Sequence, residues 1–168
     1  MRNARLLIPF VVLAALPALA ADGSPFTQTR NVAAGYIGTL DYANSRMLTE
    51  CREPMAKPES WVGESVDSWR TRNGRYWRAQ SDYMATQLDA ARAAGGDALR
   101  DRVLNAFNGV VQKDGNGSVD RWLGKYGGAT REACEKYLAM LAEGSFDIRK
   151  GGLMSSSLEE LADNFPRR

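Results

Sequence analysis

Residues 59–94, ESWVGESVDSWRTRNGRYWRAQSDYMATQLDAARAA, contain the pattern that decides the fold. In this stretch an apolar or aromatic residue returns every seven positions, at Val62, Trp69, Tyr76, Tyr83 and Ala90. Other apolar side chains widen the same stripe, namely Val66, Trp77, Met84, Leu88 and Ala91. Such spacing, sustained over many turns, is typical of an amphipathic α-helix. The stretch therefore predicts helix, with one face available for packing.

Two glycine-containing pairs interrupt or end this helical region. Asn73-Gly74 lies near its middle, and glycine costs about 1 kcal/mol in a helix interior. We therefore expect a break or kink there that divides the region into two helices. Gly95-Gly96 follows directly and is expected to end the region, because glycine readily adopts the backbone conformation found just after a helix.

The rest of the chain also reads as helices separated by glycine and proline. Helices are predicted over residues 29–51, 97–111, 130–143 and 158–165, with a turn over 112–118 and a short segment over 119–126. Ser157 followed by Glu160 has the spacing of a capping box before the last helix. No stretch alternates polar and apolar residues as a strand would. We expect an all-α, single-domain bundle of about five or six helices with one disulfide.

The first twenty residues have the pattern of a secretory signal peptide. Arg2 and Arg5 precede an apolar run over residues 6–16, and Ala18-Leu19-Ala20 forms a small-residue cleavage site. The pattern predicts cleavage after Ala20, which leaves residues 21–168 as one helical domain in the periplasm or outside the cell. No cysteine lies at the cleavage site and no later segment is apolar enough, so neither a lipid anchor nor a membrane span is expected.

The charge balance of the mature chain argues against nucleic-acid binding. Of the 22 basic residues, two lie in the leader, which leaves 20 against 20 acidic residues. A nucleic-acid-binding domain shows a basic excess or a basic stripe, and this sequence has neither. We expect no nucleic-acid partner.

Cysteine and histidine content restricts the available chemistry further. The sequence has two cysteines, Cys51 and Cys134, and in an oxidising compartment one disulfide between them is expected. It has no histidine, which excludes Ser-His-Asp and Cys-His catalysis, histidine-ligated zinc and imidazole pH switching. Apart from the weak calcium candidate below, no cofactor is expected.

Residues 113–120 resemble the middle of an EF-hand calcium loop, with Gly117 at the central glycine position. The ligands that this resemblance implies are Asp114, Asn116, Ser118 and Asp120. Two essential positions depart from it, because Gln112 stands where the first Asp belongs and Leu123 where the bidentate Glu belongs. The alternative, which we favour, is an Asp-Gly-Asn-Gly turn between two helices.

One face of the central helical region combines aromatic rings with amide side chains. The candidate binding residues on this face are Trp69, Asn73, Tyr76, Trp77, Gln80 and Tyr83. Such a face is suited to a glycan or an extended peptide. The alternative is a helix–helix seam in which the rings fill the core and their polar tips reach the rim.

Acidic pairs at helical spacing are the remaining candidates for catalytic residues. Of these pairs, Glu64 and Asp67 lie nearest the aromatic face. Two facing carboxylates can act as acid and base in glycoside cleavage; on amphipathic helices they more often form a solvated face.

Three functional hypotheses follow from these candidates. The leading one is an exported, non-enzymatic binding protein, such as an inhibitor, immunity-type protein or adaptor, with a protein partner in the cell envelope. The second is a small carboxylate-dependent enzyme that acts on envelope glycans, and the third is a calcium-responsive module.

Overall fold

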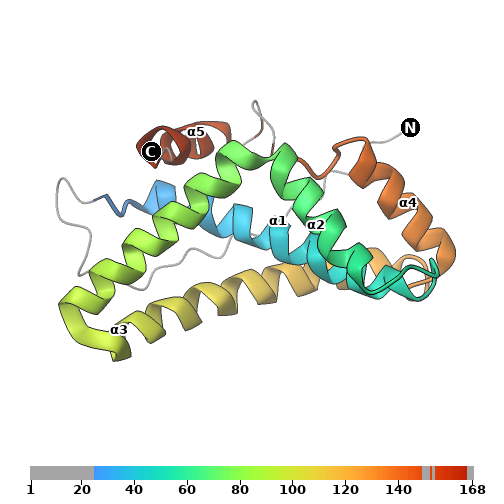
Figure 1. Ribbon diagram of the computed structural model, residues 1–168, viewed down its shortest axis with the longest axis horizontal. Helices are drawn as coiled ribbons and strands as arrows, with labels where there is room; N and C mark the ends of the chain where they lie inside the picture. The colour runs from blue at the N-terminus through green and yellow to red at the C-terminus, as the bar shows by residue number, and fades with distance from the viewer. Residues whose placement is uncertain (1–24, 149–151, 153, 166–168) are drawn as a thin grey trace.

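The computed structural model describes residues 25–148, 152 and 154–165; the predicted signal peptide over residues 1–20 lies outside the described residues. Within those ranges the chain forms five helices and no strand, as Figure 1 shows. The helices are α1 (Gln28–Arg52), α2 (Ser60–Arg72), α3 (Gly74–Gly124), α4 (Arg131–Ala142) and α5 (Ser155–Asn164). The predicted all-α fold is confirmed. None of these helices is both long and apolar enough to cross a membrane.

Helix α1 is the central element of the bundle and packs against α2, α3 and α5. Thr27 begins it, because the Thr27 hydroxyl oxygen accepts a hydrogen bond from the backbone N–H of Arg30 at 3.2 Å and so caps the first turn. Its most buried side chains follow three- and four-residue spacing, and they include Ala33, Ile37, Met47, Leu48 and Cys51. The observed helix agrees closely with the predicted range of residues 29–51.

The predicted break at Asn73-Gly74 is confirmed, since α2 ends at Arg72 and α3 begins at Gly74. Asn73 is buried, and its side chain makes hydrogen bonds to three backbone or side-chain groups around the break. The amide nitrogen donates to Trp69 O at 2.8 Å and to an Asp147 carboxylate oxygen at 3.1 Å, while the amide oxygen accepts from Ile148 N at 2.7 Å. Asn73 therefore holds the α2–α3 corner against the segment after α4.

Helix α3 is a helical hairpin, because its backbone leaves the helical region at Gly95 and Gly96. Gly96 has φ +65° and ψ −166°, a conformation essentially restricted to glycine. We call residues 74–94 the first limb and residues 97–124 the second limb. Figure 1 shows the chain reversing between them and α1 lying between the two limbs. The predicted end of the helical region at Gly95-Gly96 is thus confirmed as a sharp reversal.

The predicted turn over residues 112–118 is wrong, because these residues are helical and belong to the second limb. Gly115 in this stretch and Gly38 on α1 serve close packing. A Cβ at Gly115 would lie 2.5 Å from Cδ1 of Tyr42 on α1, and a Cβ at Gly38 would lie 2.9 Å from Cζ of Phe107. The missing side chains let α1 and the second limb approach each other. The predicted capping box is also wrong, since Ser157 lies inside α5, which starts at Ser155.

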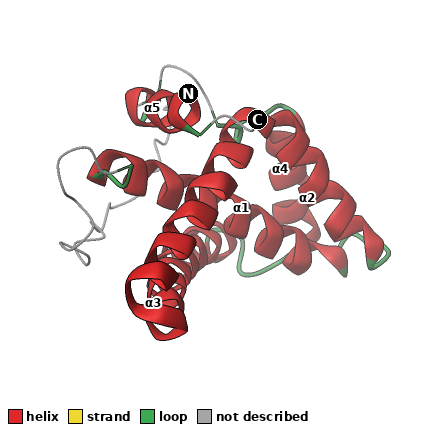
Figure 2. Cartoon of the chain, turned by 60° about the vertical axis from the view of Figure 1, so that its left-hand side comes forward, coloured by secondary structure: helices red, strands yellow, loops and turns green. Residues whose placement is uncertain are grey.

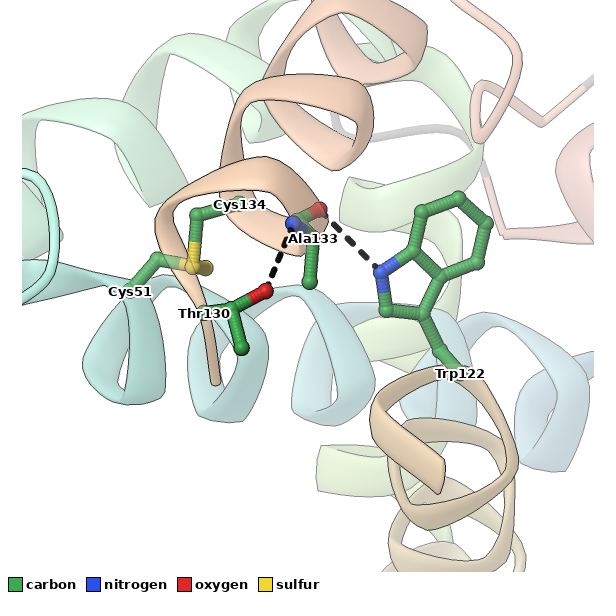
Figure 3. Close-up of a disulfide and its surroundings, with 5 residues drawn as sticks. All are labelled: Cys51, Trp122, Thr130, Ala133 and Cys134. Atoms are coloured by element: carbon green, nitrogen blue, oxygen red, sulfur yellow. Dashed lines mark hydrogen bonds between the residues drawn. A yellow bond between two sulfur atoms is a disulfide. The ribbon is translucent and has the colours of Figure 1, made fainter. Parts of the chain in front are cut away.

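The predicted disulfide is confirmed between Cys51 near the end of α1 and Cys134 in the first turn of α4 (Figure 3). Both cysteines are fully buried. Thr130 caps α4 by accepting from Ala133 N at 3.2 Å, and Trp122 at the end of the second limb donates to Ala133 O at 3.3 Å. Three different elements therefore meet at the start of α4.

Candidate functional site

The candidate aromatic binding face is largely inside the core. Trp69 and Tyr83 are 0% exposed, Tyr76 is 7% exposed and Asn73 is 4% exposed. Trp77 and Gln80 are half-buried. The structure therefore agrees with the alternative interpretation, a helix–helix seam whose rings fill the core.

The polar tips of these rings are used inside the protein. Tyr83 donates to the side-chain oxygen of Asn31 on α1 at 2.6 Å, and Tyr76 donates to a Glu159 carboxylate oxygen on α5 at 2.5 Å. Burial, and next the hydrogen bond to Glu159, raise the pKa of Tyr76 to about 12. Burial is also the main cause that raises the pKa of Tyr83. These hydroxyls thus remain protonated donors that fix α1 and α5 to the first limb.

The four candidate calcium ligands do not form a loop, because all of them lie on the helical second limb. Asn116 accepts hydrogen bonds from Tyr42 at 3.0 Å and from Arg46 at 2.8 Å, and Asp120 is paired with Arg46 at 2.7 Å. The Ser118 hydroxyl donates to Asp114 O at 2.9 Å within the helix. Among the described residues no three acidic or cysteine side chains gather as a metal site. The side chains of Asn116 and Asp120 therefore contact α1.

The two candidate catalytic carboxylates are both exposed, and no single cavity brings them together. Asp67 pairs with Arg70, one turn away, at 3.4 Å. Glu64 instead lies on the rim of an open groove that Asp67 does not line. Glycoside cleavage requires two carboxylates that face a shared substrate site. Glu64 and Asp67 do not have this arrangement.

The groove beside Glu64 lies between α2 and α4, which run side by side in Figures 1 and 2. We call it the α2–α4 groove; its volume is about 260 Å³. It is lined by Trp61, Glu64, Ser65, Ser68, Arg72, Leu138, Leu141 and Ala142. Trp61 is half-buried, with the Lys57 ammonium 5.9 Å from its ring centroid. Arg72 is held in place by Leu141 O at 3.0 Å and by Asp147 at 3.3 Å. The groove thus combines an aromatic wall and an apolar floor with a polar rim.

A second hollow, which we call the Asn44 cavity, lies between α1, the second limb and α4 and has a volume of about 100 Å³. Sequence reasoning missed it. One signal was present, because Asn44 stands four residues after Leu40 and four before Leu48 and so interrupts the apolar stripe of α1. An uncharged polar residue on a buried stripe requires a hydrogen-bonding partner, which here is Tyr137, 93 residues further along the chain.

The chain matches no protein-family model, no curated protein and no solved structure. The groove and the cavity are therefore the features that bear on function.

Proposed function

We propose that the mature chain is an exported, non-enzymatic binding protein that holds a protein partner of the cell envelope in the α2–α4 groove. The observation that carries this proposal is the half-exposed Trp61 beside an apolar floor of Leu138, Leu141 and Ala142. Tryptophan is enriched at the energetically important centre of protein interfaces. The partner is expected to insert an apolar side chain against Trp61.

The rim of the groove supplies the polar contacts that such an interface needs. The Ser65 and Ser68 hydroxyls offer hydrogen bonds, and Glu64 and Arg72 offer charges of opposite sign. Arg72 is already oriented by its bonds to Leu141 O and Asp147, so little of its side-chain entropy remains to be lost on binding. A mixed rim around an apolar floor suits a peptide or protein segment of the kind bound by inhibitors, immunity-type proteins and adaptors.

Two features support the proposed export to the periplasm or the cell exterior. The leader over residues 1–20 has the composition of a signal peptide. The Cys51–Cys134 disulfide closes 83 residues, and such bonds persist in oxidising compartments. Mass spectrometry of protein from the native host should find an N-terminus at Ala21 and no free thiol; an uncut chain with free thiols would contradict export.

Site-specific photo-crosslinking in the native host tests the partner. A benzophenone amino acid is placed at Ser68 in the groove and, as a matched control, at the exposed Asn108 on the second limb. We expect one discrete envelope protein crosslinked from Ser68 and absent from Asn108. Trp61→Ala, combined with the Ser68 crosslinker, should remove that product without lowering the melting temperature enough to unfold the protein. Identical products from both positions, or a product that survives Trp61→Ala, would contradict the proposal.

A further inference from the structure

The Asn44 cavity has the walls of a small-molecule site and uses none of the residues that line the α2–α4 groove. Three of its walls are aromatic. Trp122 comes from the second limb, Tyr137 from α4, and Phe146 from the segment after α4. Tyr137 stacks on Phe146 with ring centroids 4.7 Å apart and meets Trp122 edge-on at 5.9 Å. An aromatic wall of this kind favours a further flat ring beside it.

One polar atom at this cavity is left without a partner. Asn44 is 2% exposed, and its side-chain nitrogen makes no hydrogen bond within the described part of the chain. Its oxygen accepts from the Tyr137 hydroxyl. A buried amide N–H without a partner costs free energy comparable to a lost hydrogen bond, so such groups are rare in folded proteins. Asn44 therefore leaves an unused donor in the wall of the cavity.

The hydrogen bond to Tyr137 fixes which atom of Asn44 remains available. With the amide turned the other way, its N–H would donate to the Tyr137 oxygen, but the Tyr137 proton and the Asn44 oxygen would both be left without partners. The observed orientation satisfies more groups, since Tyr137 makes no other hydrogen bond to the described residues. Burial raises the pKa of the Tyr137 hydroxyl, which keeps it protonated and donating. The lone pairs of that hydroxyl remain able to accept.

Lys125 marks the opposite, open end of the cavity. It is the one charged residue among those that line it, and it is exposed, whereas Asn44 is almost completely enclosed. Its ammonium lies 5.8 Å from the centroid of the Trp122 ring, beside the cavity wall. A ligand thus meets an amide and a hydroxyl at the inner end and a positive charge at the outer end.

The volume restricts the size of the ligand. An enclosed apolar cavity of about 150 Å³ takes one benzene molecule. The Asn44 cavity is smaller at about 100 Å³ but partly open, so a single ring is the upper limit on what it takes, and any further substituent must extend into solvent.

We infer that the Asn44 cavity binds a small hydroxylated aromatic acid, with its ring against Trp122, Tyr137 and Phe146. The ligand hydroxyl accepts from the Asn44 nitrogen and donates to the Tyr137 oxygen, which closes a cycle with the existing Tyr137–Asn44 bond. The acid group lies at the open end beside Lys125. Each of the three polar groups then has a partner, and a fully satisfied buried network of this kind specifies one orientation.

Titration calorimetry with three probes tests the two ends of the site separately. The probes are 4-hydroxyphenylacetate, phenylacetate, which lacks the hydroxyl, and 4-methylphenol, which lacks the carboxylate. We expect 4-hydroxyphenylacetate to bind wild-type protein most tightly. Loss of the hydroxyl should weaken binding about tenfold, as for one or two net hydrogen bonds. Loss of the carboxylate should weaken it about threefold, as for an exposed ion pair.

Two variants should each weaken one of these preferences. Asn44→Leu keeps a similar volume and should reduce the preference for 4-hydroxyphenylacetate over phenylacetate, because only Tyr137 then remains to bind the ligand hydroxyl. Lys125→Met should bring 4-hydroxyphenylacetate and 4-methylphenol to nearly equal affinity, while Lys113→Met, an exposed change elsewhere on the second limb, should alter nothing. Lys125 is exposed, so its variant remains informative even if Asn44→Leu fails to fold.

A crystal structure of wild-type protein soaked with 4-hydroxyphenylacetate completes the test. Density for the ring in the cavity, with its oxygen on the Asn44 nitrogen, would support the inference. An ordered water alone at that nitrogen, no binding of any probe, or equal affinity of wild type for all three probes would overturn it. None of these outcomes depends on the α2–α4 groove, so this inference and the proposed function fail separately.

Discussion

The indole nitrogen of Trp69 on α2 donates a hydrogen bond at 3.1 Å to the carbonyl oxygen of Phe146, in the segment that follows α4. Trp69 is fully buried, and this carbonyl is the partner of its indole N–H. One side chain therefore both fills the core and satisfies a backbone carbonyl that is 77 residues away along the chain.

Trp69→Phe should lower the free energy of unfolding by about 2–3 kcal/mol, because it creates a void and leaves the Phe146 carbonyl without its donor. Urea denaturation followed by circular dichroism measures the loss. Trp61→Phe is the matched control, since Trp61 is only half-buried, and it should cost less than about 1 kcal/mol. Equal losses would contradict the buried role of Trp69.

Gly96→Ala should destabilise the protein by about 1–3 kcal/mol, because φ +65° with ψ −166° is strained for any residue with a side chain. Gly109→Ala, in the same helix, should have the opposite effect on stability. Gly109 is helical, and no atom lies within 4 Å of its added Cβ, so this change should stabilise by about 0.5–1 kcal/mol. Thermal melts of both variants check the signs, and a stabilising Gly96→Ala would contradict the reversal.

Removal of the disulfide in a Cys51→Ala, Cys134→Ala double variant should lower stability by about 4–5 kcal/mol on the chain-entropy estimate for a loop of 83 residues. Global destabilisation lowers hydrogen-exchange protection in every helix, and we expect an additional local loss in α4, which the disulfide attaches to α1. Uniform loss of protection along all helices would contradict this local role.

Alkaline pH should unfold the protein once its buried tyrosines ionise. The pKa of Tyr76 is raised to about 12 from its ordinary value of 10.0, and burial raises those of Tyr83 and Tyr137 as well. Because the folded-state pKa exceeds the unfolded one, this contribution to stability is fully present below pH 10 and is lost as pH rises through 12 and beyond. Absorbance at alkaline pH should show delayed tyrosine titration, and Tyr76→Phe should remove one delayed group; ordinary titration in wild type would contradict it.

Calcium should leave the melting temperature unchanged, because residues 112–118 are helical and Asn116 and Asp120 are engaged with Arg46. Scanning calorimetry with millimolar calcium and with chelator makes the comparison. An increase in melting temperature that Asp120→Asn abolishes would contradict it.

The elements that the sequence predicts well are those whose signals are local. The apolar spacing of residues 29–51 and the Asn73-Gly74 and Gly95-Gly96 pairs each act within a few residues, and all three predictions are confirmed. The two cysteines leave one possible pairing, which is also confirmed.

The predictions that are wrong depend on partners far away along the chain. The glycines of residues 112–118 are typical of a turn, yet Gly115 is required by the approach of Tyr42. The sequence pattern of the aromatic stripe is the same whether the stripe faces solvent or another helix. The packing of α1 and α5 against the stripe determines which of the two occurs. The cavity depends on Asn44 and Tyr137, which lie 93 residues apart.

Helix α4 meets its neighbours through a small number of named links, chiefly Cys134 to Cys51, Ala133 to Trp122 and Tyr137 to Asn44. Tyr137 is both a wall of the Asn44 cavity and the group that orients its amide. Oxidation of one cysteine pair therefore completes the pocket as well as stabilising the fold. In a freshly made chain whose thiols are still reduced, this wall is held only by noncovalent contacts.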